Sequence, residues 1–586
     1  MKKIQSIVTA LLPLFLLLII LFILFGKIFF PPPGKMLYGG DIYDAYFFWK
    51  NYLRVSILSG IIPFWNPYNF SGMPFLSHPN INIFYPLSWI FIFFPLNVSF
   101  AIYFFIHLII AFATMYWLVR QLSDKWGATF AGLTYALSGY FAARIYSGHL
   151  EYVDTAAWIP LVFGLVRLAF IKPSARRILA GGTGLAIIIF SGNELFLLFT
   201  LEVVGLYIIY FLLIKEKGKR LIVNFGRLFK VLFLYLIIGF GLAAVEFLPR
   251  WQFIQSSIRS LGITYGVSVS GSGTFTTLRL LVQPFYYGGL DNYHGPWPNI
   301  SEYTYYVGAI PILSLTIFIG YFLLRNIFKK FKSLKIINNI NGEVWFFILI
   351  IPIFAVISLG NNINPSLFQI LWKYTPFYKS IRFPVRHLFV AVFALSAASG
   401  MILGGIKDKV LKIIILGIII VDLVSFDKNF LRLIDAPTAT FDKELINTLQ
   451  NDHSLYRLLP DYSVISGVRR DLDFGAATMY KIPTTSDYNS MILARYYHFI
   501  DLLNKSPYPS IEQYNVEIPP PNPRSSYIDF LNVKYILTDN TIDYIGKEEA
   551  GKFKLKTQGD RYRLYENETY LPRFFFGRRR KNFYFR

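Results

Sequence analysis

The sequence predicts a polytopic α-helical membrane protein followed by a small extracytoplasmic α/β domain. Of its 586 residues, 54% are hydrophobic, against roughly 45–50% apolar residues in a soluble protein. Only 16% are charged, below the usual share of about 25%. The apolar residues gather in long stretches that are separated by short runs of Lys and Arg. This pattern indicates about eleven membrane spans within residues 1–426 and a polar domain over residues 427–586.

The first span is expected over residues 7–30, directly after Lys2 and Lys3. An apolar helix of this length crosses the ~30 Å hydrocarbon layer of a bilayer. The run is longer than the apolar core of a secretory signal peptide, and no small-residue cleavage motif follows it. We therefore expect a retained span rather than a cleaved leader.

The remaining spans are predicted from hydropathy in the same way. The stretch 83–94 is apolar but too short for a full crossing and is followed by Pro95, so we expect it to be interfacial or re-entrant. The predicted spans after the first cover residues 98–120, 127–147, 153–171, 177–191, 195–214, 229–248, 304–325, 344–360, 387–405 and 410–426.

The basic runs predict the orientation of the chain in the cell membrane. If the N-terminus is cytoplasmic, runs such as 215–220 and 329–332 fall in cytoplasmic loops, as the positive-inside rule requires. The same scheme places three long loops outside, at residues 31–82, 249–303 and 361–386. The C-terminal domain then also lies outside the cytoplasm.

The C-terminal domain alternates strand-like and helix-like segments. Residues 456–459 and 533–538 resemble strands, and residues 490–503 resemble a helix. Pro519 to Pro521 mark a loop between them. We expect a small α/β fold.

The composition also excludes several chemistries. The chain contains no Cys, which removes disulfides, thiolate nucleophiles and Cys-ligated metals. Its formal net charge of +23 follows from the basic loops between spans. Because no nucleic-acid-binding motif accompanies this charge, we expect no nucleic-acid partner.

The first outer loop carries the most informative polar residues. Asp41 and Asp44 are three residues apart, so a helical turn would place both on one face. An acidic group at the lip of a membrane protein is costly unless it binds or reacts with something. From the spacing alone, the first alternative is that Asp41 caps the following helix, a frequent role of Asp. The stretch from Ala45 to Leu58 is amphipathic, and its apolar side chains are available to lie at the membrane interface. They are Phe47, Phe48, Trp49, Leu53, Ile57 and Leu58.

Several short motifs resemble those of the YfhO-type bacterial membrane proteins, which belong to the GT-C superfamily of polytopic glycosyltransferases. The resemblance covers nearly the whole chain, and the first outer loop is its most specific part. Members often continue into a further C-terminal membrane segment, whereas here a basic run leads to Arg586, which is compatible with a shortened member or an incomplete chain end. The motifs are Gly40-Asp41, Trp65-Asn66-Pro67 with Gly72 and Pro74, Phe84-Tyr85-Pro86-Leu87, Leu137-Ser138-Gly139-Tyr140, Gly148-His149-Leu150, Trp158-Ile159-Pro160-Leu161, Glu302, Tyr306-Val307-Gly308, Arg382-Phe383-Pro384-Val385-Arg386, Phe530 to Thr538, Tyr565-Glu566-Asn567 and Leu571-Pro572-Arg573.

The resemblance implies a GT-C-like fold and transfer of a sugar from a polyprenyl-phosphate carrier to a cell-surface glycan, lipid or protein. It further implies that an acidic residue of the first outer loop acts as the general base, by position Asp41, with Asp44 as the second choice. A carboxylate within hydrogen-bond reach can take the proton of an acceptor hydroxyl as the new bond forms. A single displacement of this kind inverts the anomeric centre and needs one carboxylate rather than a pair.

Arginines near the outer span ends are candidates for binding the donor phosphate. They are Arg250, Arg382 and Arg386, and the planar guanidinium suits phosphate because it donates two parallel hydrogen bonds. The alternative is that these side chains extend to lipid headgroups.

Further polar residues of the outer segments are candidates for substrate binding. His149 lies at an outer span end, where a satisfied interfacial histidine is the alternative. Glu302 could orient the acceptor or join a divalent metal site, although no tight ligand spacing supports a metal. Asp291 and His294 either line the acceptor side or belong to a solvated loop.

Two other functional classes fit the same topology. A transporter or flippase of lipid-linked glycans would need polar residues within spans, for which Asn193, Glu194 and Glu202 are candidates. A non-catalytic membrane assembly protein would tolerate loss of the Asp41 carboxylate.

Overall fold

The computed structural model divides the chain into two compact units, each described by itself below. Unit 1 comprises Met1–Tyr43, Asn82–Arg250 and Gly262–Asp435, and unit 2 comprises Asp44–Ile81, Trp251–Leu261 and Ala436–Arg586. The first outer loop therefore contributes to both units. The structure describes all residues except 1, 216–220, 298, 328–339, 376, 438–441, 461–474, 488–490, 505–521, 540–550, 561 and 575–586. The expected loop at Pro519 to Pro521 lies outside the described residues.

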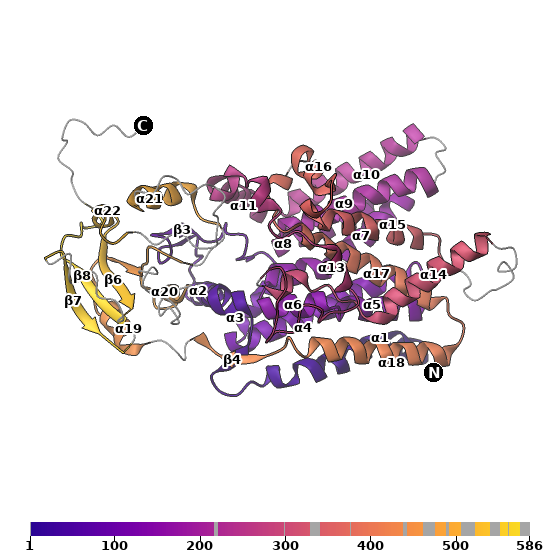
Figure 1. Cartoon of the computed structure of the whole chain (residues 1–586), viewed down its shortest axis with the longest axis horizontal. Coiled ribbons are helices and arrows are strands. Elements are labelled where there is room, and N and C mark those ends of the chain that lie inside the picture. Colours follow the sequence, from indigo (N-terminus) through magenta and orange to yellow (C-terminus); the bar gives the residue numbers. More distant parts are fainter. Residues whose placement is uncertain are drawn as a thin grey trace. The chain divides into compact units, whose positions relative to one another are not determined.

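Unit 1 is a bundle of long apolar helices (Figure 1). Within the described residues, 6 helices are long and apolar enough to cross a membrane, and the apolar helices over Ala309–Arg325 and Val344–Ser358 are shorter. The polytopic helical fold predicted from the sequence is therefore confirmed, whereas fewer helices of the described residues meet this length and hydropathy than the eleven or so spans that were expected. Its main helices are α1 (Lys2–Phe29), α4 (Leu96–Arg120), α5 (Lys125–Ala136), α6 (Gly139–Ser147), α7 (Leu150–Ile171), α8 (Ala175–Ser191), α9 (Glu194–Tyr210), α10 (Leu221–Leu242), α14 (Ala309–Ile327), α15 (Val344–Ser358), α17 (Leu388–Gly404) and α18 (Lys409–Asp427).

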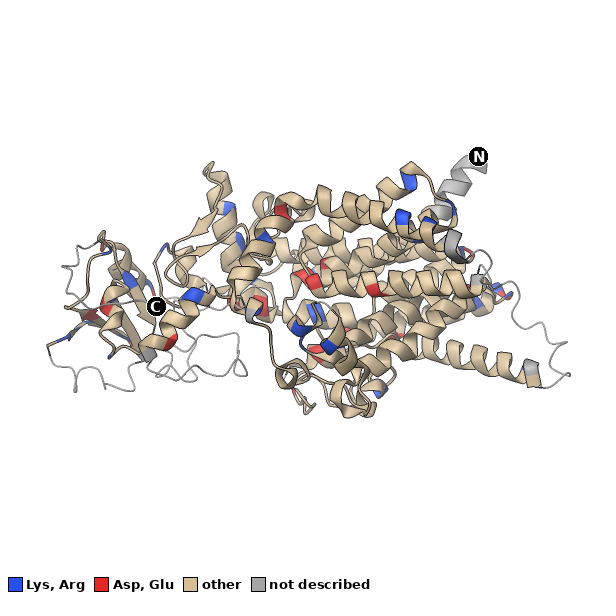
Figure 2. Cartoon of the chain, turned by 90° about the horizontal axis from the view of Figure 1, so that it is seen from above, with Lys and Arg blue, Asp and Glu red and all other residues tan. Residues whose placement is uncertain are grey.

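Helix α17 forms the centre of the bundle and is buried along almost its whole length. It packs against α5, α14 and α15. Its closest crossing is with α5, where a Cβ added at Gly400 would lie 2.5 Å from the carbonyl oxygen of Gly127. Small residues at such crossings let two helix backbones approach closely in a membrane protein. Figure 2 colours the charged residues of the whole chain and shows few of them along the helices of the bundle.

Two predicted spans are not single helices. The span predicted over 127–147 is wrong in this respect, because the chain breaks between α5 and α6. At this break the Gly139 N–H donates to the Tyr306 carbonyl at 2.8 Å, a partner 167 residues away that no local pattern reveals. The span predicted over 229–248 is also interrupted: α10 ends at Leu242 and α11 (Ala244–Ser256) follows.

Short elements hold the outer segments of unit 1. Strand β1 (Lys35–Leu37) pairs antiparallel with β4 (Leu433–Asp435), which ties the chain after α1 to the chain after α18. The stretch 83–94 forms the short helices η2 (Pro86–Trp89) and α3 (Ile90–Phe93), as expected for a segment that does not cross the membrane by itself.

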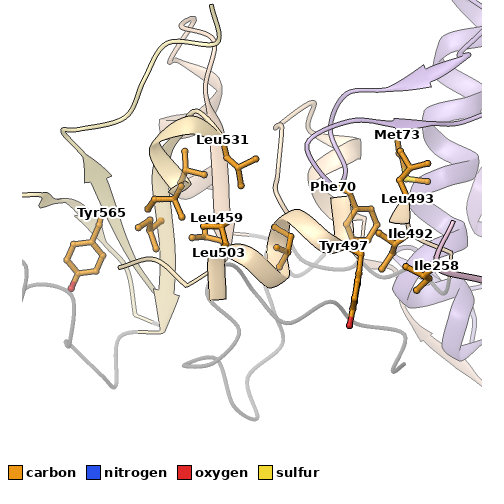
Figure 3. Close-up of a cluster of buried hydrophobic side chains, with 14 of the residues drawn as sticks. Phe70, Met73, Ile258, Leu459, Ile492, Leu493, Tyr497, Leu503, Leu531 and Tyr565 are labelled. Atoms are coloured by element: carbon orange, nitrogen blue, oxygen red, sulfur yellow. The ribbon is translucent and has the colours of Figure 1, made fainter. Parts of the chain in front are cut away.

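Unit 2 contains the mixed sheet predicted for the C-terminal domain. Its strand order is β5-β6-β8-β7, with β5 and β6 parallel and the other pairs antiparallel. Leu459, Leu531 and Tyr565 belong to a buried apolar cluster of this unit, which also includes Phe70 and Ile258 from the other two segments (Figure 3). The strands and helices are β2 (Trp65–Asn66), β3 (Met73–Pro74), β5 (Arg457–Pro460), β6 (Val533–Asp539), β7 (Phe553–Gln558), β8 (Tyr562–Asn567), α2 (Phe47–Leu58), α19 (Lys443–Gln450), α20 (Ala476–Met479), α21 (Ala494–Asn504) and α22 (Tyr527–Phe530).

The interfacial role expected for residues 45–58 is wrong for most of its apolar side chains. Phe47, Phe48, Trp49 and Leu53 are all buried within the chain, whereas Ile57 is partly buried and Leu58 is 64% exposed. The amphipathic pattern was correct, but the apolar face of α2 packs against protein, including α20 of the same unit, rather than lying on lipid.

Candidate active site

The site begins with the sharp turn that ends α6. The Gly148 N–H donates to the carbonyl of Ile145, and the His149 N–H donates to the carbonyl of Arg144, both at 3.0 Å. This pair of bonds is the Schellman motif, which places a glycine in the left-handed region where the helix stops. Gly148 has φ +76°. The turn folds His149 back toward the Arg144 side chain.

Two glycines bring the first outer loop against this turn. A Cβ added at Gly39 would lie 2.9 Å from the Gly148 Cα, and one added at Gly148 would lie 2.6 Å from the Ile42 nitrogen. The two backbones therefore touch, and only glycine fits at both places. Asp41 lies in the helical turn that starts at residue 40, just before the π-helical segment η1 (Ile42–Tyr46). This packing sets its carboxylate Oδ2 at 3.4 Å from the His149 Nε2.

The contacts of His149 define where its proton is. An Arg144 Nη1 lies 3.1 Å from the Nδ1 of His149, and a guanidinium can only donate, so Nδ1 accepts. A neutral ring then carries its proton on Nε2, which faces Asp41. Burial, followed by the positive charge of Arg144, lowers the pKa of His149 to about 3, so the ring is neutral near pH 7. His149 has no free basic nitrogen in this arrangement.

Glu302 lies at the centre of a buried ion cluster. Arg386 donates to it through Nε at 2.9 Å and Nη2 at 2.6 Å, and Arg144 donates through Nη2 at 3.1 Å. Burial opposes the charge of the carboxylate, but the two guanidiniums outweigh it and hold the pKa of Glu302 well below its usual range. The short helix η5 (Ile300–Tyr303) positions Glu302, and Ser147 at the end of α6 binds its neighbour Ser301 at 2.6 Å.

Arg382 completes the positive side of the cluster. Its guanidinium lies over the Phe383 ring, 5.1 Å from the centroid, and its Nε is buried without a hydrogen-bond partner among the described residues. Burial, followed by the charge of Arg386, lowers the pKa of Arg382. A guanidinium in this situation is stabilised by any anion that approaches it.

Aromatic rings flank the arginines. The Tyr152 ring lies 5.0 Å from the guanidinium carbon of Arg144 and 5.2 Å from that of Arg386. The centroid of the Phe383 ring lies 4.6 Å from the guanidinium carbon of Arg386. Rings at this distance attract a cation through their π faces and hold it in place.

The structure brings together Asp41, His149, Glu302, Arg382 and Arg386, and it places the other predicted site residues elsewhere. Arg250 binds Glu246 and donates to the Ile189 carbonyl at 2.9 Å and to Asn82 at 3.3 Å. The exposed Asp291 forms an ion pair with Arg432 at 3.1 Å, and the His294 Nδ1 lies 3.2 Å from the Asn292 carbonyl. Asp44 belongs to η1 and is assigned to unit 2.

Each of the residues considered for transport has a contact within the chain, although the Oε2 of Glu202 is buried without a hydrogen-bond partner among the described residues. The Asn193 side chain caps α9 by accepting from the Phe196 N–H at 3.2 Å. Glu194 lies 4.0 Å from Arg250, and Glu202 accepts a hydrogen bond from Tyr378.

Sequence reasoning missed Arg144, which connects His149 to Glu302. The signal that could have found it is simple: Arg144 lies inside a stretch predicted to cross the membrane, where a charged residue is costly and needs a partner.

The polar groups around Glu302 are mainly guanidinium donors, which suit an anion. Among the described residues, no three His, Asp or Glu side chains come together as metal ligands. Both oxygens of Glu302 accept hydrogen bonds from arginines.

Fold and site define a multi-pass helical membrane protein with a mixed-sheet C-terminal domain and a charged cluster at the ends of its membrane helices. No protein-family model matches the sequence, and no curated protein matches it. Three solved structures match it over most of its length at low sequence identity. ArnT from Cupriavidus metallidurans bound to undecaprenyl phosphate matches with 12% identity and TM-score 0.43 over 96% of this chain and 99% of that chain. The apo form of ArnT matches with 10% identity and TM-score 0.39 over 97% and 100%. The Archaeoglobus fulgidus oligosaccharyltransferase, in complex with Zn and sulfate, matches with 13% identity and TM-score 0.38 over 86% of this chain and 64% of that chain.

Proposed function

We propose that the protein is a membrane glycosyltransferase of the YfhO type, which moves a sugar from a polyprenyl-phosphate carrier to a cell-surface glycan, lipid or protein with inversion. Asp41 is its general base. The observation that carries this proposal is the pairing of a partly exposed carboxylate with a histidine whose two nitrogens are already committed. Because His149 accepts from Arg144 and turns its N–H toward Asp41, it cannot compete for the acceptor proton.

In this proposal the Asp41 carboxylate accepts the proton of the acceptor hydroxyl. The Asp41 carboxylate has 31% of its side-chain surface exposed, so one oxygen can reach an acceptor hydroxyl while Oδ2 faces the His149 N–H. As the acceptor oxygen attacks the anomeric carbon, its proton passes to Asp41 and the bond from the carbon to the carrier phosphate breaks. Glu302 is fully engaged by arginines and remains ionised, so it does not share this role.

The leaving phosphate requires positive charge. The cluster supplies it, because Arg144, Arg382 and Arg386 together carry one positive charge more than Glu302 and Asp41 neutralise. We assign the phosphate first to Arg382, because its guanidinium forms no hydrogen bond or ion pair with the described residues, whereas Arg144, Arg250 and Arg386 all bind protein groups. The exposed edge of Arg386 is the second site. Preorganised donors of this kind stabilise charge that develops on the leaving group. In this proposal the N-terminus is cytoplasmic and Asp41 lies on the outer side.

Replacing Asp41 by Asn tests the proposal. The full chain, purified and reconstituted, is assayed for transfer from a panel of polyprenyl-phosphate sugars to cell-envelope extract. We expect the Asp41→Asn variant to lose about 10²–10⁴-fold in turnover, the usual contribution of a general base. The matched control is Asp435→Asn, which removes an exposed carboxylate paired with Lys35. Equal turnover of the two variants would remove Asp41 from the role of base, and turnover by neither variant nor the parent chain would favour a transporter or an assembly protein.

A further inference from the structure

The outer segment between α15 and α17 carries an exposed apolar face. Helix α16 (Leu367–Tyr374) buries Phe368 and presents Ile370 and Tyr374, which are 49% and 72% exposed. Phe377, three residues after Tyr374, is 63% exposed. It holds a left-handed backbone with φ +70°, which is unfavourable for a bulky residue. Large apolar side chains shown in this way to the outside of a chain mark a surface that something covers.

The position of α16 in the chain indicates what covers it. Eight residues separate the end of the apolar helix α15, at Ser358, from α16, and nine residues separate α16 from the membrane span over Pro384–Gly404. Helix α16 also packs against α15 within the same unit. A short amphipathic helix held between the ends of two membrane helices lies at the level where hydrocarbon meets headgroups.

The cations of the segment match the same surroundings. Lys373 and Lys379 are both exposed, and their ammonium groups lie 5.2 Å from the Tyr374 ring and 5.6 Å from the Trp372 ring. Aromatic rings and lysines arranged together on one edge are typical of membrane interfaces, where the ring enters the headgroup layer and the ammonium meets lipid phosphate. The Trp372 N–H donates to Ser268 at 3.0 Å, which fixes the helix on the bundle.

We propose that the α16 face, formed by Ile370, Lys373, Tyr374, Phe377 and Lys379, inserts into the outer leaflet and binds the phosphates of anionic phospholipids. This inference is independent of the proposed sugar transfer. It makes α16 a fixed contact between the bilayer surface and the segment that continues to Arg382 and Arg386.

The absence of cysteine from the chain makes a clean test possible. Single variants Ile370→Cys, Tyr374→Cys and Phe377→Cys of the full chain are labelled with a polarity-sensitive fluorophore and placed in phosphatidylcholine nanodiscs, with or without phosphatidylglycerol. Quenching is measured with a nitroxide on the lipid headgroup region and with iodide in water. Two controls have matched exposure: Ile418→Cys in the span α18, at 47%, and Leu555→Cys in strand β7, at 48%.

We expect the α16 labels to be quenched by the lipid-borne nitroxide and shielded from iodide at least fivefold relative to the free dye. We also expect phosphatidylglycerol to shift their emission to the blue, and the Lys373→Gln/Lys379→Gln background to lose at least half of that shift. Quenching by iodide as strong as for the free dye would overturn the proposal. Protection from both quenchers would overturn it as well, because a protein partner or a second copy would then cover the face.

Discussion

The substitution Gly148→Ala tests how the fold delivers Asp41 to His149. An added Cβ would lie 2.6 Å from the Ile42 nitrogen and 3.1 Å from the Asp41 nitrogen, both backbone atoms that no rotamer change can move. Ordinary contact begins near 3.4 Å, so the loop must retreat by about 0.8 Å. A displacement of about 1 Å in a catalytic group can cost ~10²-fold in rate. We therefore expect about 10–100-fold lower transfer activity from Gly148→Ala.

Two control variants separate the causes. Gly34 has φ +79°, close to the +76° of Gly148, but a Cβ added there meets nothing within 4 Å. Gly34→Ala therefore carries the same left-handed backbone penalty, roughly 1–2 kcal/mol, without the collision. Gly320→Ala has open space at an ordinary φ and reports the effect of the methyl group alone. Activity is measured as kcat/KM in nanodiscs, and thermal unfolding is followed in parallel. If Gly148→Ala and Gly34→Ala lose the same activity, the backbone approach does not position Asp41.

Three further predictions concern stability. Glu302→Gln leaves Arg144 and Arg386 facing each other without a buried counter-charge, and we expect it to lower the free energy of unfolding by about 3–5 kcal/mol. Thermal unfolding measures this loss against the exposed control Glu568→Gln. An equal unfolding midpoint for the two variants would contradict the prediction. Because the pKa of His149 falls to about 3 on folding, from about 6.5 in an unfolded chain, its contribution to stability is complete above pH 6.5 and is lost as the pH falls toward 3. His149→Gln should thus flatten the fall of the unfolding midpoint between pH 7 and 4, whereas the exposed His453→Gln should not. Ile536→Ala, in the core of unit 2, should cost about 2–5 kcal/mol, and an effect as small as that of Leu555→Ala on the exposed side of β7 would show that this core is not packed as described.

The sequence predicted most helices because their apolar runs are local. The span positions of α4, α7, α17 and α18 agree with the structure to within a few residues. The break between α5 and α6 could not be predicted, because it depends on the bond from Gly139 to the distant Tyr306. A hydropathy value is summed over a window of neighbouring residues, so it contains no information about a hydrogen bond to a distant part of the chain.

The amphipathic helix α2 shows a second limit of the pattern. A stripe of apolar residues shows that one face avoids water, but it does not distinguish lipid from protein. Phe48 and Trp49 are core residues of unit 2. The exposed face of α16, a helix of only eight residues, was not predicted from the sequence. The difference is set by tertiary packing.

The candidate site was predictable in its residues but not in its connections. Asp41, His149, Glu302 and Arg386 were all selected from the sequence, and the structure brings them together. Their linkage runs through Arg144, which donates to both His149 and Glu302. Without it, His149 would be free to act as a base and Glu302 would lack one of its two counter-charges.

The different surroundings of the arginines decide which of them remains available to a phosphate. Both terminal nitrogens of Arg250 already have partners, a carboxylate, an amide or a carbonyl, so an anion that approached them would have to displace these groups, although the Nε of Arg250 has no hydrogen-bond partner among the described residues. Two of the hydrogen-bond donors of Arg386, Nε and Nη2, already bind Glu302. Arg382 is half-buried beside Arg386, and both burial and that neighbour disfavour its charge. A negative ligand relieves this cost at Arg382 and meets the remaining donors of Arg386 at the same time, which is the arrangement that a departing lipid phosphate requires.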